Sequence, residues 1–358
     1  MNSGNNSEVK SQMSEVESQT QDRESLHRGN RPVLFYITDT GRVLAEKISR
    51  LYPESQVLKY SPGLFAEQWS ASKALICIMA AGIAVRAIAP LLKDKRSDPA
   101  VVVLDEKGEY AVSLLSGHIG GANAFAREIA GYLGAQAVIT TASDVQGKVA
   151  LDLWAMEHDL YVEDYQKLKA LSTRIVNGGK VQLMAECPVD TQNLPVELEL
   201  ADQPEKADII ISERVSVGKA LFLRPRNLFG GIGCNRGTGS DEIREFIMSV
   251  CEDEGLSFHS IGGIATIDMK RDEAGLIDFA RDNGLHIDFF SKDELNREAE
   301  AQQVTRSEVV MTATGAVAVA EPAALLCAKK YNDSCAIIRP KLKRGNVTFA
   351  IARADFTL

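Results

Sequence analysis

The sequence SGHIGGAN places a hydroxyl, an imidazole and a carboxamide, those of Ser116, His118 and Asn123, in one short glycine-rich stretch. A mostly apolar segment at 112–115 precedes it, and apolar residues with helical spacing follow it at 122–133. The three side chains are therefore predicted to lie where a strand ends and a helix begins, the edge at which open α/β sheets bind ligands. An imidazole there can move a proton while the other two groups hold a substrate.

The glycines of this stretch are Gly117, Gly120 and Gly121. They allow backbone angles that other residues avoid and let a ligand approach the main chain. The first amides of the following helix favour an anionic group. Two other interpretations stay open: a turn that binds nothing, and a His118 that only caps the helix. The glycine spacing differs from the dinucleotide-binding fingerprint, so that kind of site is not predicted.

A second glycine-rich stretch, at 228–240, is predicted to be a strand that enters a turn, followed by a helix from Asp241. No lysine follows its glycines as the phosphate-binding Walker loop requires, which argues against that loop. We predict instead that the stretch binds a carboxylate through backbone amides and a guanidinium. Its candidate binding residues are Gly233, Cys234, Asn235, Arg236, Gly237 and Thr238.

Composition limits the possible partners. The chain has 358 residues and a formal net charge of -9, which argues against nucleic acid as the main partner. Its longest apolar stretch, at 74–92, is interrupted by glycine, arginine and proline, so no membrane span is predicted. The 6 cysteines form no CxxC pair, and His118 has no partner at zinc-ligand spacing, so we expect no protein-bound metal. Reduced cysteines and the lack of a secretory signal favour the cytoplasm.

Strands alternate with helices along the chain. This pattern predicts a multi-domain α/β protein with mostly parallel sheets and helices on both faces. Residues 1–30 are polar and are predicted to form a disordered tail. The predicted domains are an N-terminal α/β domain at 31–145, a small middle α/β region at 146–226 and a C-terminal α/β domain at 227–358. Near the end of the chain, two antiparallel strands are predicted to flank a basic turn at 341–345.

Several motifs recur together in one known family. They are IMAAGIAVR at 78–86, DPAVV at 98–102, LLSGHIGGAN at 114–123, VITTASD at 138–144, GIGCNRGT at 231–238, AEPAA at 320–324 and the final basic hairpin. In this order and spacing they resemble the cobalt-precorrin-5A hydrolases of anaerobic cobalamin biosynthesis, the CbiG type. The resemblance covers about residues 33–358.

The resemblance implies an enzyme with an N-terminal domain, a variable middle and a C-terminal domain. It implies hydrolysis of cobalt-precorrin-5A, in which the ring A δ-lactone of a cobalt corrinoid opens and a two-carbon fragment leaves as acetaldehyde. The product is cobalt-precorrin-5B, and the cobalt arrives in the substrate rather than as a cofactor. A non-catalytic corrinoid carrier and a nucleotide-binding regulator remain alternatives. The sequence also leaves open a homo-oligomer and contacts with other enzymes of the pathway.

The chemistry of that reaction suggests roles for the first glycine-rich stretch. Lactone hydrolysis needs an activated water and a stabiliser for the developing oxyanion. His118 is the candidate general acid or base, and Asn123 is a candidate for orienting water or an acetate arm. Ser116 and the amides near Gly120 and Gly121 are candidates for holding the oxyanion. A nucleophilic Ser116 is an alternative, although nothing nearby in the sequence completes a triad.

Substrate binding by this acidic chain requires local positive charge, because the implied substrate carries several carboxylates. Arg86 and Arg236 lie in segments of small residues and are the main candidates, since arginine suits bidentate carboxylate contacts. The basic hairpin adds Lys341, Lys343 and Arg344. Glu321 is grouped with the binding residues as a possible second acid or base, although a glutamate in a first helical turn is also stabilised by the helix dipole alone.

Overall fold

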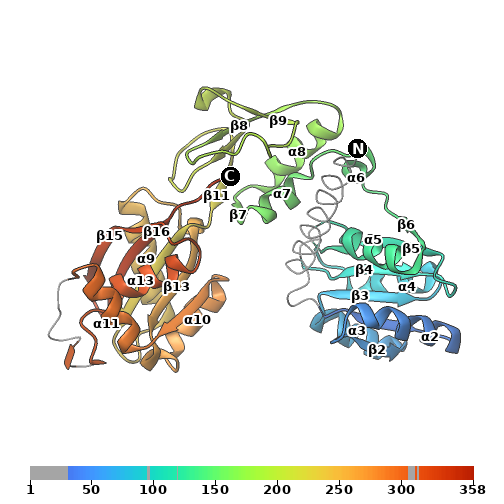
Figure 1. Cartoon of the computed structure of the whole chain (residues 1–358), viewed down its shortest axis with the longest axis horizontal. Helices are drawn as coiled ribbons and strands as arrows, with labels where there is room; N and C mark the ends of the chain where they lie inside the picture. The colour runs from blue at the N-terminus through green and yellow to red at the C-terminus, as the bar shows by residue number, and fades with distance from the viewer. Residues whose placement is uncertain (1–30, 95–96, 119, 305–310, 313) are drawn as a thin grey trace, which may run out of the picture. The chain divides into compact units, whose positions relative to one another are not determined.

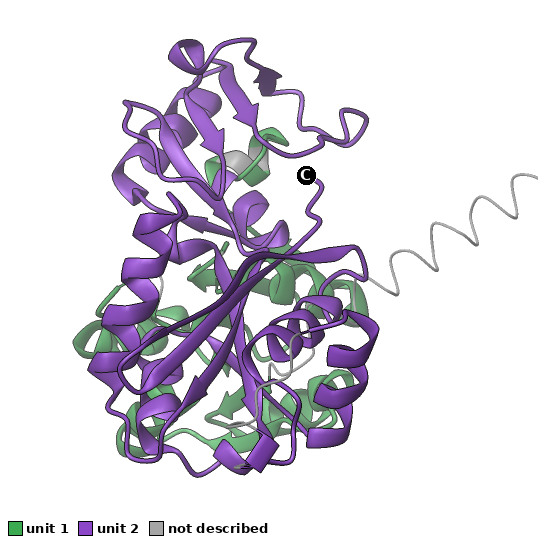
Figure 2. Cartoon of the chain, turned by 90° about the vertical axis from the view of Figure 1, so that its left-hand side faces the viewer, with its two compact units in different colours: residues 1–150 green, residues 151–358 purple. Residues whose placement is uncertain are grey.

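The computed structural model describes residues 31–94, 97–118, 120–304, 311–312 and 314–358, and the predicted disordered tail lies outside them. The chain divides into two compact units, residues 1–150 and residues 151–358 (Figure 2). The first unit is built on one sheet and the second on two (Figure 1). The predicted fold class, α/β with several mostly parallel sheets, is confirmed.

The sheet of the first unit has its strands in the order β2-β1-β3-β4-β5-β6. Neighbouring strands run parallel except β4 and β5, which are antiparallel. The carboxyl ends of β5 and β6 therefore lie at the edge opposite to those of β1 to β4. The strands are β1 (Val33–Tyr36), β2 (Gln56–Lys59), β3 (Ala74–Ile78), β4 (Ala100–Leu104), β5 (Tyr110–Leu115) and β6 (Gln136–Val138).

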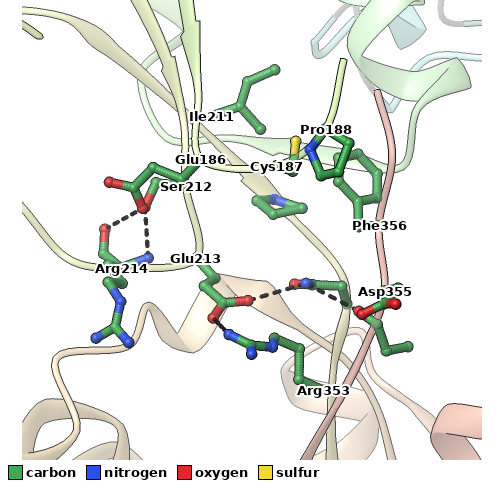
Figure 3. Close-up of a pocket in the computed structure, with 13 residues that line it drawn as sticks. Glu186, Cys187, Pro188, Ile211, Ser212, Glu213, Arg214, Arg353, Asp355 and Phe356 are labelled. Carbon is green, nitrogen blue, oxygen red and sulfur yellow. Dashed lines mark hydrogen bonds and ion pairs between the residues drawn. The ribbon is translucent and has the colours of Figure 1, made fainter. Parts of the chain in front are cut away.

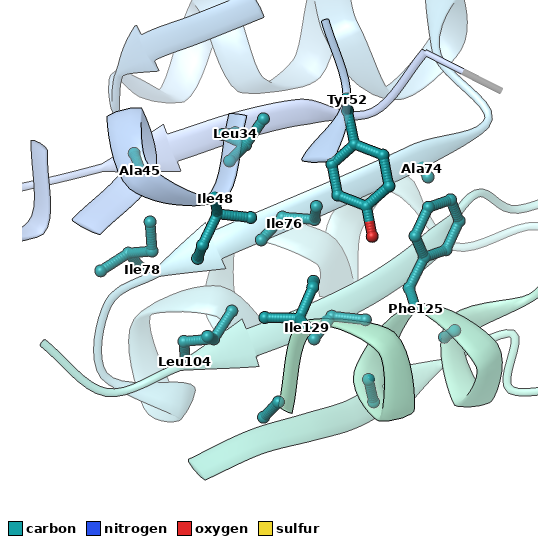
Figure 4. Close-up of a cluster of buried hydrophobic side chains, with 14 of the residues drawn as sticks. Leu34, Ala45, Ile48, Tyr52, Ala74, Ile76, Ile78, Leu104, Phe125 and Ile129 are labelled. Atoms are coloured by element: carbon teal, nitrogen blue, oxygen red, sulfur yellow. The ribbon is translucent and has the colours of Figure 1, made fainter. Parts of the chain in front are cut away.

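Helices cover both faces of this sheet, which explains why its central strands are apolar throughout. Along β3, Ile76 and Ile78 face a cluster completed by α2 and α5 (Figure 4), whereas Leu75 and Cys77 face a cluster completed by α3 and α4. The helices of the unit are α2 (Asp39–Ile48), α3 (Pro62–Ala71), α4 (Ala81–Ile88), α5 (Ala122–Leu133) and α6 (Ala142–Gln146).

The second unit begins with a small sheet in the order β7-β11-β10-β8-β9, in which only the β7–β11 pair is antiparallel. The buried guanidinium of Arg224 holds this part together. It pairs with Glu163 at 2.7 Å and donates to the backbone oxygens of Ser212 and Arg214. The elements are α7 (Leu151–Glu157), β7 (Leu160–Val162), α8 (Tyr165–Val176), β8 (Val181–Ala185), β9 (Leu198–Leu200), β10 (Ile209–Ile211) and β11 (Leu221–Pro225).

The other sheet of the second unit has the order β14-β13-β12-β16-β15. β12, β13 and β14 run parallel, and β16 and β15 continue the sheet antiparallel. One core cluster packs it against α9 and α10, and another packs it against α11 and α13. The elements are β12 (Leu228–Cys234), α9 (Ser240–Asp253), β13 (Ile261–Ile267), α10 (Ala274–Asp282), β14 (His286–Phe290), α11 (Lys292–Ala301), α13 (Ala320–Lys329), β15 (Cys335–Arg344) and β16 (Val347–Ala354).

The second glycine-rich stretch differs from its prediction, because Gly233 and Cys234 belong to strand β12 rather than to a turn. Its glycines serve close packing. A Cβ on Gly231 would lie 1.7 Å from the backbone oxygen of Ala320, so the start of α13 rests directly on the strand. A Cβ on Gly230 would lie 2.5 Å from the ring of Phe349 on the other face. Glycine is therefore required here by helix–strand packing and not by turn geometry.

The predicted antiparallel pair near the end of the chain is confirmed as β15 and β16. The basic residues, however, lie in β15, and the turn is Gly345-Asn346, with Gly345 at φ 56. Successive side chains of β15 point to opposite faces of the sheet, so the basic side chains are divided between the two faces. Leu342 packs in the cluster of α9, and Arg344 stacks at 5.0 Å on Phe246 of that helix. Lys341 and Lys343, at the intervening positions, turn to the α13 face.

Replacing Gly231 with alanine is expected to destabilise the second unit, because the added methyl group collides with backbone atoms that cannot rotate away. The expected loss in the free energy of unfolding is about 1–3 kcal/mol or more. The matched control is Gly239→Ala, where a Cβ meets nothing within 4 Å. Urea denaturation of both variants measures the effect, and equal stability of the two would contradict the packing argument.

Candidate active site

The first glycine-rich stretch lies at the edge formed by the carboxyl ends of β5 and β6. His118 and Asn123 follow β5, and Asp144, in α6, follows β6. Because β5 and β6 are parallel neighbours, both loops emerge at the same edge of the sheet. The strand-to-helix placement predicted for Ser116, His118 and Asn123 is thus observed.

One carboxylate organises the site. Nε2 of His118 lies 2.8 Å from Oδ2 of Asp144, and Nδ2 of Asn123 donates to the same oxygen at 2.9 Å. Arg127, from the next turn of α5, pairs with the other oxygen of Asp144. Asp144 was not among the predicted site residues, although it lies in the VITTASD motif. Its sequence separation of 26 residues from His118 hides the pairing, which depends on β5 and β6 being neighbours.

The charges and hydrogen bonds around Asp144 favour its ionised form. Burial opposes ionisation, but the hydrogen bonds and charges of Arg127 and His118 outweigh it and lower the pKa of this carboxyl below its ordinary value. The side chains of His118 and Asp144 are only 17% and 14% exposed, so their pairing is weakly screened by solvent. A carboxylate held in this way orients the imidazole and stabilises its protonated form, as a proton-transferring histidine requires.

Asn123 offers a free acceptor beside this pair. Its side chain is almost fully buried, and its Nδ2 also donates to Thr141 at 3.3 Å. Its Oδ1 has no hydrogen-bond partner among the described residues. A buried unpaired carbonyl oxygen is costly, and a water or a substrate donor would satisfy it.

The glycines build a tight turn. A Cβ on Gly120 would lie 2.4 Å from that of Ser116, and a Cβ on Gly117 would lie 2.7 Å from Oδ1 of Asn123. Gly121 adopts a φ of 87, which glycine tolerates best. The amides of Gly121, Ala122 and Asn123 donate to backbone oxygens within the turn. These amides are therefore already used for folding, whereas the sequence prediction assigned amides near Gly120 and Gly121 to an oxyanion.

Ser116 is already engaged by a backbone partner. Its hydroxyl donates to the backbone oxygen of Asp98 at 3.0 Å, and its φ is 54, an unusual value for a residue other than glycine. Ser116 would have to leave this bond to donate to an oxyanion or to act as a nucleophile. A cavity of about 640 Å³ adjoins the same loop and is lined in part by Asp98, Gly120 and two lysines, Lys73 and Lys93.

The structure does not bring Arg86 to this site. Arg86 lies on α4, and its guanidinium donates to the backbone oxygen of Gly82, in the first turn of that helix, at 3.0 Å. That turn follows the carboxyl end of β3, at the edge of the sheet opposite to Asp144. Arg86 is exposed there.

The predicted binding residues of the second unit fall into two groups. Gly233, Cys234 and Asn235 line a pocket of about 300 Å³ together with Lys270, Lys341 and Lys343. The remaining residues are engaged with neighbours: Arg236 pairs with Asp272 at 2.8 Å, the amide of Gly237 donates to Glu273 at 2.7 Å, and Thr238 donates to the backbone oxygen of Asn235 at 2.8 Å. Glu321 accepts from the amide of Lys341 at 3.3 Å.

A further pocket, of about 370 Å³, lies where the last residues of the chain meet the middle sheet (Figure 3). Its charged side chains are largely paired with each other. Glu213 accepts from Arg353 and from Asn227, each at 3.0 Å, and the hydroxyl of Ser212 donates to Glu186. Burial raises the pKa of Cys187 to about 11, so this thiol is not activated. No sequence motif indicates this pocket.

The described residues contain no group of three or more His, Cys, Asp and Glu side chains that could hold a metal ion. No helix within the described ranges is both long enough and apolar enough to cross a bilayer. All six cysteines have free thiols.

Comparison with known proteins identifies the class. The chain matches the family profiles described as Cobalamin synthesis G N-terminal at residues 63–144, Cobalamin biosynthesis central region at residues 149–225 and Cobalamin synthesis G C-terminus at residues 228–352. Together with the extended similarity to curated relatives described next, these matches show that the chain belongs to the CbiG family of cobalamin biosynthesis proteins.

Individual relatives match over most of the chain. The protein is 34% identical to the cobalt-precorrin-5A hydrolase of Priestia megaterium, over 91% of this chain and 95% of that protein. It is also 34% identical to the cobalt-precorrin-5A hydrolase of Salmonella typhimurium, over 82% of this chain and 90% of that protein. A solved structure of a cobalamin biosynthesis protein G homologue from Sulfolobus solfataricus matches at 22% identity with a TM-score of 0.39, over 91% of this chain and 97% of that one.

The lowered pKa of Asp144 predicts a pH-dependent contribution to stability. A carboxyl whose pKa is lower in the folded state stabilises the fold above its ordinary pKa of 3.8, and this contribution disappears as the pH falls through the folded-state value. The loss of unfolding free energy caused by Asp144→Asn should therefore be largest at neutral pH and shrink below about pH 4. Urea denaturation across this pH range measures the difference.

Asp39→Asn serves as the control, because the Asp39 carboxylate is fully exposed at the start of α2. It should change stability little at any pH in the series. A difference between wild type and Asp144→Asn that stays constant down to the acidic end of the series would contradict the assigned role of the carboxylate.

Proposed function

We propose that this protein is a cobalt-precorrin-5A hydrolase, which opens the ring A δ-lactone of cobalt-precorrin-5A and releases acetaldehyde to give cobalt-precorrin-5B. The observation that carries the proposal is 34% identity, over 91% of the chain, to a cobalt-precorrin-5A hydrolase. The pairing of His118 with Asp144 supports it, because the reaction needs a group that accepts and returns protons.

The first step is hydrolysis of the lactone. In the proposed mechanism His118 accepts a proton from water, and the hydroxide formed adds to the lactone carbonyl. Asp144 stabilises the resulting imidazolium, and Oδ1 of Asn123 accepts a hydrogen bond from the water. The acyl carbon–oxygen bond then breaks, which leaves a carboxylate on the macrocycle and an alcohol on the two-carbon unit.

The second step releases that unit. Removal of the alcohol proton allows the bond between its carbon and the macrocycle to break, as in a retro-aldol reaction. Acetaldehyde leaves, the bonding electron pair stays on the macrocycle, and a proton from an acid replaces the fragment. No oxidant or reductant is consumed, so a single group that exchanges protons near this centre supports both steps.

The cobalt is part of the substrate, and we assign the protein no cofactor of its own. We also assign it to the cytoplasm, since six free thiols are typical of proteins in a reducing compartment.

Purified protein incubated anaerobically with cobalt-precorrin-5A should release acetaldehyde, one molecule for each molecule of substrate converted. Trapping with a hydrazine and mass spectrometry of the corrinoid measure the two products together. A corrinoid that binds but keeps its mass would instead show a carrier, and substrate that neither binds nor reacts would contradict the proposal altogether.

Replacing His118 with alanine should lower turnover by about 10²–10⁴-fold, the usual contribution of general acid–base catalysis. Substrate affinity should change little, because binding depends on the carboxylate arms. The matched control is His286→Ala, since His286 forms a similar pair with Asp288 at 2.9 Å but lies in the other unit and is exposed. Near-normal acetaldehyde release in single-turnover experiments with folded His118→Ala would show that the imidazole is structural.

A further inference from the structure

The pocket beside the start of α13 concentrates positive charge in an acidic protein. Of the residues that line it, Lys270, Lys341 and Lys343 are charged, and all three are cationic. Lys341 and Lys343 are exposed and make no side-chain ion pair with the described part of the chain. In a chain with a net charge of -9, such a cluster favours an anionic ligand.

Nearby carboxylates do not neutralise this pocket. Glu273 is buried, and it accepts from Lys270 at 3.0 Å and from the amide of Gly237 at 2.7 Å. Its own burial opposes ionisation, but these partners outweigh it and lower its pKa. Glu321 accepts from the backbone amide of Lys341 and not from its ammonium group. The two hairpin lysines therefore keep their charge available to a ligand.

The strands and α13 fix the shape of the pocket. Thr348 of β16 donates to the backbone oxygen of Gly233 at 3.0 Å, and a side chain on Gly233 would collide with it. Ala318, Val319 and Ala320 form the wall at the helix start, where no side chain caps the helix. The first turn of a helix presents a positive dipole, which adds to the lysine charges.

From this arrangement we infer that the pocket is a carboxylate site that holds an acidic side arm of the tetrapyrrole substrate, an inference that rests on the proposed function. A volume of about 300 Å³ admits an acetate or propionate arm but not a macrocycle. The pocket uses Gly233, Cys234 and Asn235 from the second glycine-rich stretch, while the ammonium groups of Lys341 and Lys343 replace Arg236 as the carboxylate partners.

The test uses a cobalt corrinoid that is not the substrate. Dicyanocobyrinic acid, with all its carboxylates free, and its full methyl ester are titrated into the full-length protein by calorimetry. The acid should bind, more weakly as salt is added, and the ester should bind at least roughly tenfold more weakly. Equal binding of acid and ester, or no binding of the acid, would overturn the inference.

Variants then locate the site. Lys341→Gln combined with Lys343→Gln should weaken binding of the acid roughly tenfold. Arg344→Gln removes the same kind of charge from the same strand, but on the α9 face, and should change affinity by no more than about twofold. Equal effects of the two variants would show a general charge effect and overturn the assignment.

Acetaldehyde assays on the same variants separate this inference from the proposed function. The double lysine variant should raise KM for cobalt-precorrin-5A and leave kcat nearly unchanged. If the wild type releases acetaldehyde and the double lysine variant has an unchanged KM, the carboxylate site is refuted but the proposed function stands. If the acid binds as expected but the wild type releases no acetaldehyde, the carboxylate site stands and the proposed hydrolase function is refuted.

Discussion

The antiparallel pairing of β4 with β5 decides which loops of the first unit meet. Were β5 parallel to β4, the loops that follow β3 and β5 would emerge at one edge, and Arg86 would lie on the same side as His118. The reversal instead moves the loops after β5 and β6 to the opposite edge. His118 and Asp144 meet there for this reason, and the chemistry of the site depends on that one change of strand direction.

Within this edge, Asp144 links three parts of the chain. Its two oxygens hold the imidazole of the glycine-rich turn, the carboxamide at the start of α5 and a guanidinium one turn further along. The short helix α6 supplies this carboxylate, so the position of His118 depends on an element that contains none of the residues first suspected of catalysis. Partly buried and surrounded by donors, the carboxylate stays ionised and keeps the imidazole oriented.

The sequence predicted the parts of the fold that depend on local patterns. Helical spacing at 122–133 identified α5, and the predicted antiparallel pair near the end of the chain is β15 and β16. Helix α3 was not predicted, because its apolar residues are spaced too evenly around the helix for a clear amphipathic pattern. Contacts between residues far apart in the sequence were not predicted. They are the bond of Asp144 to His118, the place of Lys270 in the lysine pocket and the pairing of Arg236 with Asp272. These contacts depend on the order of the strands, which no local pattern reveals.

The close approach of α13 to β12 has a mechanical consequence. Where side chains separate a helix from a sheet, they can change rotamer and absorb a displacement. At Gly231 main chain rests on main chain, with no side chain between them to rearrange. The start of α13 is therefore coupled to the centre of the sheet by main-chain contact, which no change of side-chain rotamer can relieve.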